Sequence, residues 1–117
     1  MAQASAARAG QSADRAAELQ AKFIRGLADP TRLRIVGFLL NGPRSVSEIM
    51  AKLRLPQSRI SNHLACLKWC GYVSTERLGR TVIYRIDDDR VRQILDLTRA
   101  IVVDNAEHIA NCVRIDS

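Results

Sequence analysis

The chain has few aromatic side chains, few prolines and no long apolar run. Phe, Trp and Tyr make up 4% of its 117 residues, and three residues are proline, so any core must be aliphatic. No stretch approaches the ~18 apolar residues of a membrane-spanning helix, and the N-terminus lacks the apolar segment of a signal peptide. We therefore expect a cytoplasmic protein with no membrane partner, whose three cysteines are reduced thiols and not disulfides.

The positive charge of the chain is concentrated in its middle. The length suits a single domain, the formal net charge is +6 and the isoelectric point is about 9.9. From Ile49 to Ile86 the one acidic residue is Glu76, whereas from Asp87 onward acids outnumber bases. This distribution predicts a DNA-facing centre on a scaffold that does not contact DNA. The bases of the central segment are Lys52, Arg54, Arg59, Lys68, Arg77, Arg80 and Arg85.

The N-terminal half predicts a tail followed by three helices. Residues 1–13 are mainly Ala, Gln, Ser and Gly, and we expect a disordered tail there. Apolar residues at helical spacing predict a first helix over residues 14–27. Asp29-Pro30 then pairs an N-cap with proline at the first helical position, and the second helix ends at Asn41-Gly42-Pro43. Ser45-Val46-Ser47-Glu48 is a capping box that opens a short third helix.

The C-terminal half predicts a helix, a β-hairpin and a last helix. The helix covers residues 56–70, and β-branched runs at 72–76 and 81–86 flank a glycine turn. Asp87-Asp88-Asp89 caps the last helix, which is a simpler explanation of this acidic run than a hard-cation site. The last helix carries an apolar stripe too long for so small a core, so we expect a second copy to cover it.

This element order predicts a mainly α fold with a small β-hairpin, a dimeric winged helix-turn-helix. Residues 14–117 would form one DNA-binding and dimerisation domain. The helix over residues 56–70 would enter the major groove of double-stranded DNA, and the hairpin would reach an adjacent groove or the backbone. Because each chain has one such helix, the predicted target of the homodimer is an inverted repeat. We expect DNA contacts from Gln57, Ser58, Arg59, Ser61, Asn62, His63, Arg77 and Arg80.

The same helix carries two cysteines, Cys66 and Cys70. Residues four apart share one helical face, so both sulfurs can point the same way. They lie off the apolar stripe of this helix and share a stripe with Arg59 and His63. The alternative is that both are small buried hydrophobes, as free cysteines often are. We also expect Arg59 and Lys68 to lower the thiol pKa, and Trp69 to pack at the base of the hairpin.

These motifs resemble the ArsR–SmtB family of metal-responsive repressors. The resemblance rests on Gly26-Leu27-Ala28-Asp29-Pro30-Thr31-Arg32-Leu33-Arg34-Ile35, on Ser58-Arg59-Ile60-Ser61-Asn62-His63-Leu64, on Leu67 with Gly71-Tyr72-Val73, and on Gly79-Arg80 with Tyr84. It implies a homodimeric winged helix that represses a detoxification or efflux operon and leaves DNA when metal binds.

The family places its sensing sites differently in different members. The arsenic-type site is absent, because Ser45–Ile49 contains no thiol, and of the zinc-type site on the last helix only Asp104 and His108 remain. The resemblance is closest to the CmtR-type cadmium and lead sensors, and it implies a metal site of Cys66, Cys70 and Cys112. Three thiolates suit a soft effector, cadmium or lead first, with mercury or arsenite as alternatives.

Two other functions stay open for the thiols. A redox-sensing repressor of the same fold would oxidise Cys66 and Cys70, although an i,i+4 disulfide is strained. A metal-buffering protein would bind metal without a DNA role, although the basic segment argues against it. We do not expect an enzyme, since neither histidine stands in a recognisable nucleophile–base arrangement and no phosphate-binding glycine loop is present.

Overall fold

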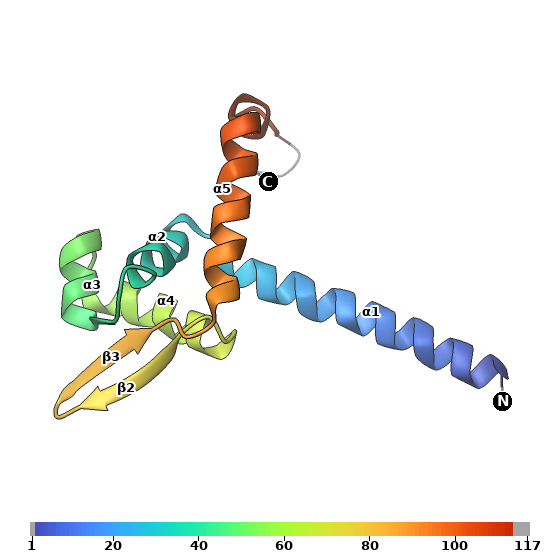
Figure 1. The fold of residues 1–117 in the computed structure, drawn as a ribbon, viewed down its shortest axis with the longest axis horizontal. Coiled ribbons are helices and arrows are strands. Elements are labelled where there is room, and N and C mark those ends of the chain that lie inside the picture. Colours follow the sequence, from blue (N-terminus) through green and yellow to red (C-terminus); the bar gives the residue numbers. More distant parts are fainter. Residues whose placement is uncertain (1, 114–117) are drawn as a thin grey trace.

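A computed structural model describes residues 2–113, except for the side chains of residues 2–9 and 11. Helices and a three-stranded antiparallel sheet form a winged helix-turn-helix (Figure 1), as the sequence predicts. The strand order in the sheet is β1-β3-β2. The elements are α1 (Ala2–Leu27), α2 (Pro30–Leu39), β1 (Arg44–Ser45), α3 (Val46–Leu53), α4 (Gln57–Trp69), β2 (Ser74–Leu78), β3 (Thr81–Arg85) and α5 (Asp89–Ala110).

Helix α1 begins earlier than the sequence pattern predicts. Residues 2–13, expected as a disordered tail, are its first turns. Alanine has the highest helix propensity of all residues, and six alanines in this segment continue the helix without any apolar stripe. In Figure 1 this part of α1 projects away from the other elements.

Side-chain caps fix the starts of α2 and α3, as predicted. The Asp29 carboxylate accepts a hydrogen bond from the backbone N–H of Thr31 at 3.2 Å, and Pro30 occupies the first helical position. Ser45 and Glu48 form a complete capping box, each side chain accepting from the other's backbone N–H. These caps set where the two helices that precede α4 begin.

Gly71 ends α4 and turns the chain into the wing. Its φ of +87° is a left-handed conformation that glycine adopts without strain. The backbone N–H of Tyr72 then donates to the carbonyl of Leu67 at 2.9 Å. Strands β2 and β3 form the predicted hairpin around Gly79, and residues 44–45 add the short strand β1, which pairs with β3. Two residues are too few to leave a strand signal in the sequence.

The core is aliphatic with one buried tyrosine, Tyr72. It is formed by one face of each helix of the winged domain, and Ile60, Leu64 and Leu67 of α4 are fully buried within it. The polar face of α4 therefore points outward on a rigid support. The buried residues are Leu27, Ile35, Val36, Leu39, Ile49, Leu53, Ile60, Leu64, Leu67, Tyr72, Val73, Val91 and Leu95.

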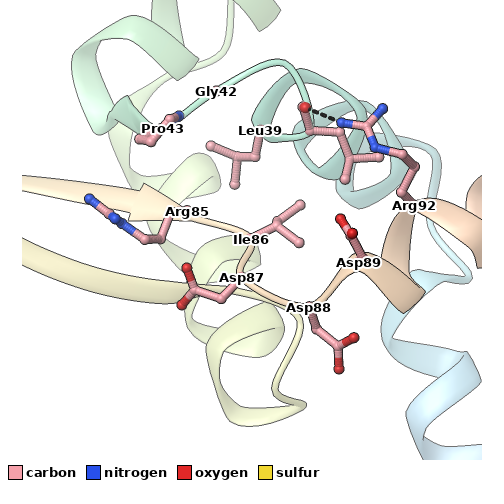
Figure 2. A pocket seen from close by; sticks show the side chains of 10 residues that line it. Leu39, Gly42, Pro43, Arg85, Ile86, Asp87, Asp88, Asp89 and Arg92 are labelled. Atoms are coloured by element: carbon pink, nitrogen blue, oxygen red, sulfur yellow. Dashed lines mark hydrogen bonds between the residues drawn. The ribbon is translucent and has the colours of Figure 1, made fainter.

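Helix α5 starts with the predicted aspartate cap. Asp88 accepts from the backbone N–H of Arg90 at 2.9 Å, and its ion pair with Arg90 lowers the pKa of its carboxyl to about 2. The shallow pocket of about 200 Å³ beside it is closed on one side by Arg92, which donates to the Leu40 carbonyl at 2.5 Å. Figure 2 shows the carboxylates of Asp87, Asp88 and Asp89 pointing in different directions, an arrangement unsuited to one cation.

Helices α1 and α5 expose apolar side chains that this chain does not cover. The Cα radius of gyration is 17.8 Å, well above the ~13 Å expected for a compact domain of this length. The exposed apolar residues on these two helices are Leu19, Ile24, Leu97, Ile101, Val102, Val103 and Ile109. None of the helices within residues 2–113 is long and apolar enough to cross a bilayer.

Candidate DNA interface and thiol site

The outward face of α4 presents the polar residues that the sequence singled out. Gln57, Ser58, Arg59, Ser61 and Asn62 are all exposed, whereas the opposite face is buried. No side chain caps the start of the helix, where the N-cap is Pro56. Its first backbone N–H groups therefore remain free to meet an anion such as a phosphate.

The wing presents the two predicted arginines, Arg77 and Arg80, both exposed. The Nε of Arg77 donates to the carbonyl of Gly79 at 3.3 Å, which holds its stem along the turn. An ion pair between Arg85 and Glu76 joins the strands nearer their base. The tip of the wing therefore has positive charge that no acid within the described residues neutralises.

His63 differs from the other polar residues of α4, because it is half-buried and contacts Arg32 of α2. A guanidinium nitrogen of Arg32 lies 3.3 Å from His63 Nδ1. Arg32 also donates to the backbone carbonyls of Gly26, at 2.7 Å, and Arg25, at 3.2 Å. A single side chain therefore ties the end of α1 to the middle of α4. The sequence placed Arg32 in a family motif but gave no sign of this contact.

The thiols of Cys66 and Cys70 line one pocket under α1. The pocket has a volume of about 490 Å³ and lies between α1 and the end of α4. Both cysteines are half-buried, and neither forms a disulfide. The remaining walls are Leu19, Lys22, Phe23 and Trp69. The sequence predicted that the two thiols share one helical face, but not that α1 covers them.

Helix α1 approaches Cys70 closely at Gly26. A Cβ at this position would lie 3.0 Å from Cys70 Sγ and 3.0 Å from the Tyr72 ring, so only glycine fits without displacement. One turn earlier, Phe23 stacks on Tyr72 with ring centroids 4.2 Å apart, and its carbonyl accepts from the Tyr72 hydroxyl at 2.7 Å. These contacts hold α1 against the thiol pair.

Burial raises the pKa of the Cys70 thiol, and the neighbouring Cys66 thiol raises it further. The nearby charges of Arg32 and Lys22 act in the opposite direction but do not reverse the shift. For Cys70, the expectation of a lowered pKa caused by Arg59 and Lys68 is therefore wrong, because desolvation outweighs the positive charges. The same burial raises the pKa of Tyr72 to about 12.

The sequence predicted that Trp69 packs at the base of the wing, but the structure shows that it does not. Its side chain is 90% exposed at the end of α4, beside the thiol pocket. The apolar stripe of α4 is already filled by three aliphatic residues, and position 69 lies off it.

Cys112 does not join the other two cysteines within one chain. No group of three or more His, Cys, Asp or Glu side chains suited to a metal ion occurs within the described part of the chain. Cys112 follows α5, and Figure 1 shows the far end of that helix pointing away from α4. Asp104 and His108 lie on this exposed part of α5. Asn105 between them has non-helical backbone angles, and its side chain donates to the Ile101 carbonyl.

Comparisons with known proteins agree with this architecture. Residues 29–75 match the family model "Bacterial regulatory protein, arsR family". The chain is 43% identical over 95 residues to a probable mercury resistance operon repressor of Streptomyces lividans, covering 81% of this chain and 76% of that protein. It is 43% identical over 75 residues to the regulator CmtR of Mycobacterium tuberculosis, covering 64% of each chain.

Solved structures show the same fold. NolR of Sinorhizobium fredii superposes with a TM-score of 0.73 at 33% identity, over 77% of this chain and 90% of that one. A homodimeric winged helix-turn-helix DNA-binding domain from Mycobacterium bovis also gives 0.73, at 27% identity, over 81% of this chain and 88% of that one. Fold, motifs and relatives define a winged-helix DNA-binding regulator and not an enzyme. The chain belongs to the ArsR family of bacterial regulatory proteins.

Proposed function

We propose that this protein represses a metal-resistance or efflux operon and leaves its operator when cysteine thiolates bind a soft metal ion. The observation that carries the proposal is that one helix, α4, holds the exposed polar residues at its start and the thiol pair near its end. The similarity to a mercury resistance repressor and to CmtR supports a metal effector. Cadmium or lead is our first candidate, with mercury or arsenite as the alternatives.

The DNA-bound form uses the polar face of α4 and the tip of the wing. Arg59 is suited to a guanine edge and Asn62 to an adenine edge, while the hydroxyls of Ser58 and Ser61 suit phosphates. Arg77 and Arg80 would follow the backbone or the minor groove. His63 supports this surface from behind through Arg32, in addition to its predicted DNA contact.

The operator-binding form is a homodimer on an inverted repeat. The exposed apolar residues of α1 and α5 supply a face that a second copy would bury. A solved relative of the same fold is homodimeric. Two α4 helices related by a twofold axis would then read two half-sites separated by ~10 base pairs or a multiple of it.

The metal site combines Cys66 and Cys70 of one chain with Cys112 of the second subunit. Two thiols already share a pocket, and soft thiolate ligands favour soft cations over hard ones. Cys112 follows α5, whose apolar face is exposed in the single chain. Dimerisation would bury that face and would bring Cys112 to the pocket. Among the described residues, no carboxylate that would favour a hard ion lines this pocket.

The contacts around Gly26 suggest how metal binding reaches the DNA surface. Cys70 Sγ lies directly against Gly26, whose carbonyl accepts from Arg32, which in turn contacts His63 on α4. Drawing Cys70 into a metal site would displace the end of α1 and, through Arg32, change the support of the DNA-facing half of α4. A ~100-fold preference of metal for the free protein corresponds to ~2.7 kcal/mol of coupling.

The raised pKa of Cys70 argues against the redox alternative. Thiol oxidation proceeds through the thiolate, and redox-sensing cysteines have lowered pKa values and open access. Cys70 is half-buried with a raised pKa. Metal binding tolerates this state, because a soft cation displaces the thiol proton as it binds.

Mixing two variants tests the proposed site. One chain carries Cys112→Ser and the other carries Cys66→Ser with Cys70→Ser, and each alone should fail to release operator DNA on adding cadmium. A mixed dimer contains one complete site if the third ligand comes from the second subunit, so mixing should restore release and thiolate-to-metal absorption. If mixing does not restore release, the site shared between subunits is contradicted. If the unmodified protein does not bind its own promoter fragment in a gel shift, the metal-buffering alternative is favoured.

A further inference from the structure

Another pocket, of about 400 Å³, lies between α2, α3 and α5 and is lined by three basic side chains. Figure 1 shows α2 between the other two helices. Arg34 comes from α2, Lys52 from α3 and Arg99 from α5. All three are exposed, and within residues 2–113 none of them forms an ion pair with an acid. Positive side chains that converge on one hollow repel each other and focus a positive potential there, so this pocket favours an anion.

Gly37 of α2 makes room for Arg99 in this pocket. A Cβ at position 37 would lie 3.2 Å from a guanidinium nitrogen of Arg99, tighter than an ordinary van der Waals contact, so the charged end of Arg99 lies directly against α2. Glycine inside a helix costs ~1 kcal/mol relative to alanine, and here it leaves the space that Arg99 occupies. None of the exposed apolar residues that we assign to the dimer face lines this pocket, so the site does not require that face to be free.

The walls between the three cations are apolar. They are formed by Leu33, Phe38 and Leu53, of which Leu53 belongs to the core. The Lys52 ammonium lies 5.8 Å from the centre of the Phe38 ring, within the range of a cation–π contact. Charge and apolar surface therefore adjoin in one pocket, and a ligand that uses both carries an anionic group on an apolar body.

We propose that this pocket binds a small phosphate monoester whose organic group is apolar. The inference goes beyond the proposed repressor function and does not depend on the thiols. A phosphate monoester has a charge of about −1.5 to −2 at pH 7, which matches three cations without acid partners better than the single charge of a carboxylate or of a DNA phosphodiester. Guanidinium groups bind phosphate oxygens through paired N–H donors, and the Asn41 amide at the pocket adds a further donor. A volume of about 400 Å³ falls within the ~300–1,000 Å³ of ligand pockets.

The test compares phenyl phosphate, inorganic phosphate and phenol on the protein without DNA, with binding measured by calorimetry and located by amide NMR shifts. We expect one phenyl phosphate per chain, bound ~10-fold or more tightly than either of the other two, with shifts at the backbone N–H groups of Gly37 and Asn41. Arg99→Gln and Lys52→Gln should each weaken phenyl phosphate ~3- to 10-fold, as expected for the loss of one charged donor. Arg15→Gln removes the same charge from the exposed surface of α1 and should leave the affinity unchanged.

Gly37→Ala tests the placement of Arg99 without removing its charge. The added methyl group displaces the guanidinium and should weaken phenyl phosphate as Arg99→Gln does. Alanine also raises the helix propensity of α2, so the Tm should stay at or above that of the unmodified protein. Unchanged affinity for phenyl phosphate in Gly37→Ala would contradict the assigned position of Arg99.

Absence of phenyl phosphate binding, or equal affinity for phenyl phosphate and inorganic phosphate, would overturn the inference. Unchanged affinity in both Arg99→Gln and Lys52→Gln would overturn it as well, because the probe would then bind elsewhere. If phenyl phosphate does not bind and Lys52→Gln weakens all DNA sequences as Arg80→Ala does, the pocket belongs to the DNA surface. The proposed repressor function is tested separately, by the release of operator DNA on adding a soft metal ion, which involves none of these probes.

Discussion

Gly26 of α1 lies so close to Cys70, the C-cap of α4, that an added methyl group would sit 3.0 Å from the Cys70 sulfur. The same glycine accepts a hydrogen bond from Arg32, which reaches His63 in the DNA-facing helix. One residue without a side chain is therefore in contact with the proposed sensor and linked to the proposed reader. The most specific consequences of the structure concern this contact.

Gly26→Ala should weaken metal binding and destabilise the fold. The added methyl group overpacks Cys70 and Tyr72 at a cost of ~1–3 kcal/mol, and the gain in helix propensity of ~1 kcal/mol offsets only part of it. Displacement of the thiol should lower cadmium affinity ~10- to 100-fold, as changes next to metal ligands do. Gly10→Ala is the matched control, since its Cβ meets nothing within 4 Å in the same helix. Equal metal affinity in the two variants would contradict the proposed effect of the Gly26–Cys70 contact on metal binding.

Arg32→Lys should separate metal binding from DNA release. Lysine keeps the charge but lacks the planar fork that reaches two carbonyls and His63 together. We expect cadmium to bind with near-normal affinity while the metal-induced loss of operator affinity falls below about tenfold. Arg34→Lys, an exposed arginine on the same helix, should behave as the unmodified protein. Fluorescence anisotropy of operator DNA with and without cadmium measures the coupling, and an unchanged ratio would rule out this relay.

Arg59→Ala and Arg80→Ala should weaken DNA binding in different ways. Removing a base contact by Arg59 should cost ~1–3 kcal/mol and relax specificity at one base pair in each half-site. Removing a phosphate contact by Arg80 should weaken all sequences alike and reduce the salt slope by about one. Arg15→Ala, on the exposed surface of α1, is the control. If Arg59→Ala weakens binding to all DNA sequences equally, Arg59 contacts a phosphate and not a base.

Cadmium affinity should rise with pH. Because burial raises the pKa of Cys70 above its ordinary value of 9.0, this thiol keeps its proton at neutral pH and must release it to the solvent when metal binds. Each proton released raises the apparent affinity about tenfold per pH unit below the thiol pKa. The same raised pKa makes the metal-free fold lose stability as pH rises above 9.0, because unfolding then favours the thiolate. A pH-independent affinity would mean that the ligands are already deprotonated.

Local signals predicted much of the fold. The caps at Asp29, Ser45 and Asp88 each depend on residues within three positions, and all three occur as expected. The apolar spacing of α4 likewise predicted which side is buried. The extension of α1 to Ala2 was missed, because an alanine-rich segment without apolar periodicity is equally typical of a disordered tail.

The surroundings of the thiols could not be predicted from the sequence. Spacing placed Cys66 and Cys70 on one face, but their cover by α1 depends on the packing of helices about 40 residues apart. The approach of Gly26 and the contact between Arg32 and His63 also join distant segments. Burial raises the pKa of Cys70. The sequence prediction considered only the neighbouring basic residues and did not include this burial. In the proposed metal site, Cys112 comes from the second subunit, which the sequence of one chain does not place.

Metal-induced release of operator DNA by the Cys66→Ser, Cys70→Ser double variant decides whether these two thiols are the sensor. We expect this variant to bind the operator with the affinity of the unmodified metal-free protein. We also expect it to stay bound when cadmium, lead, mercury or arsenite is added. Release of the double variant by any of these effectors would show that the sensing site lies elsewhere, with Asp104 and His108 of α5 the next residues to test.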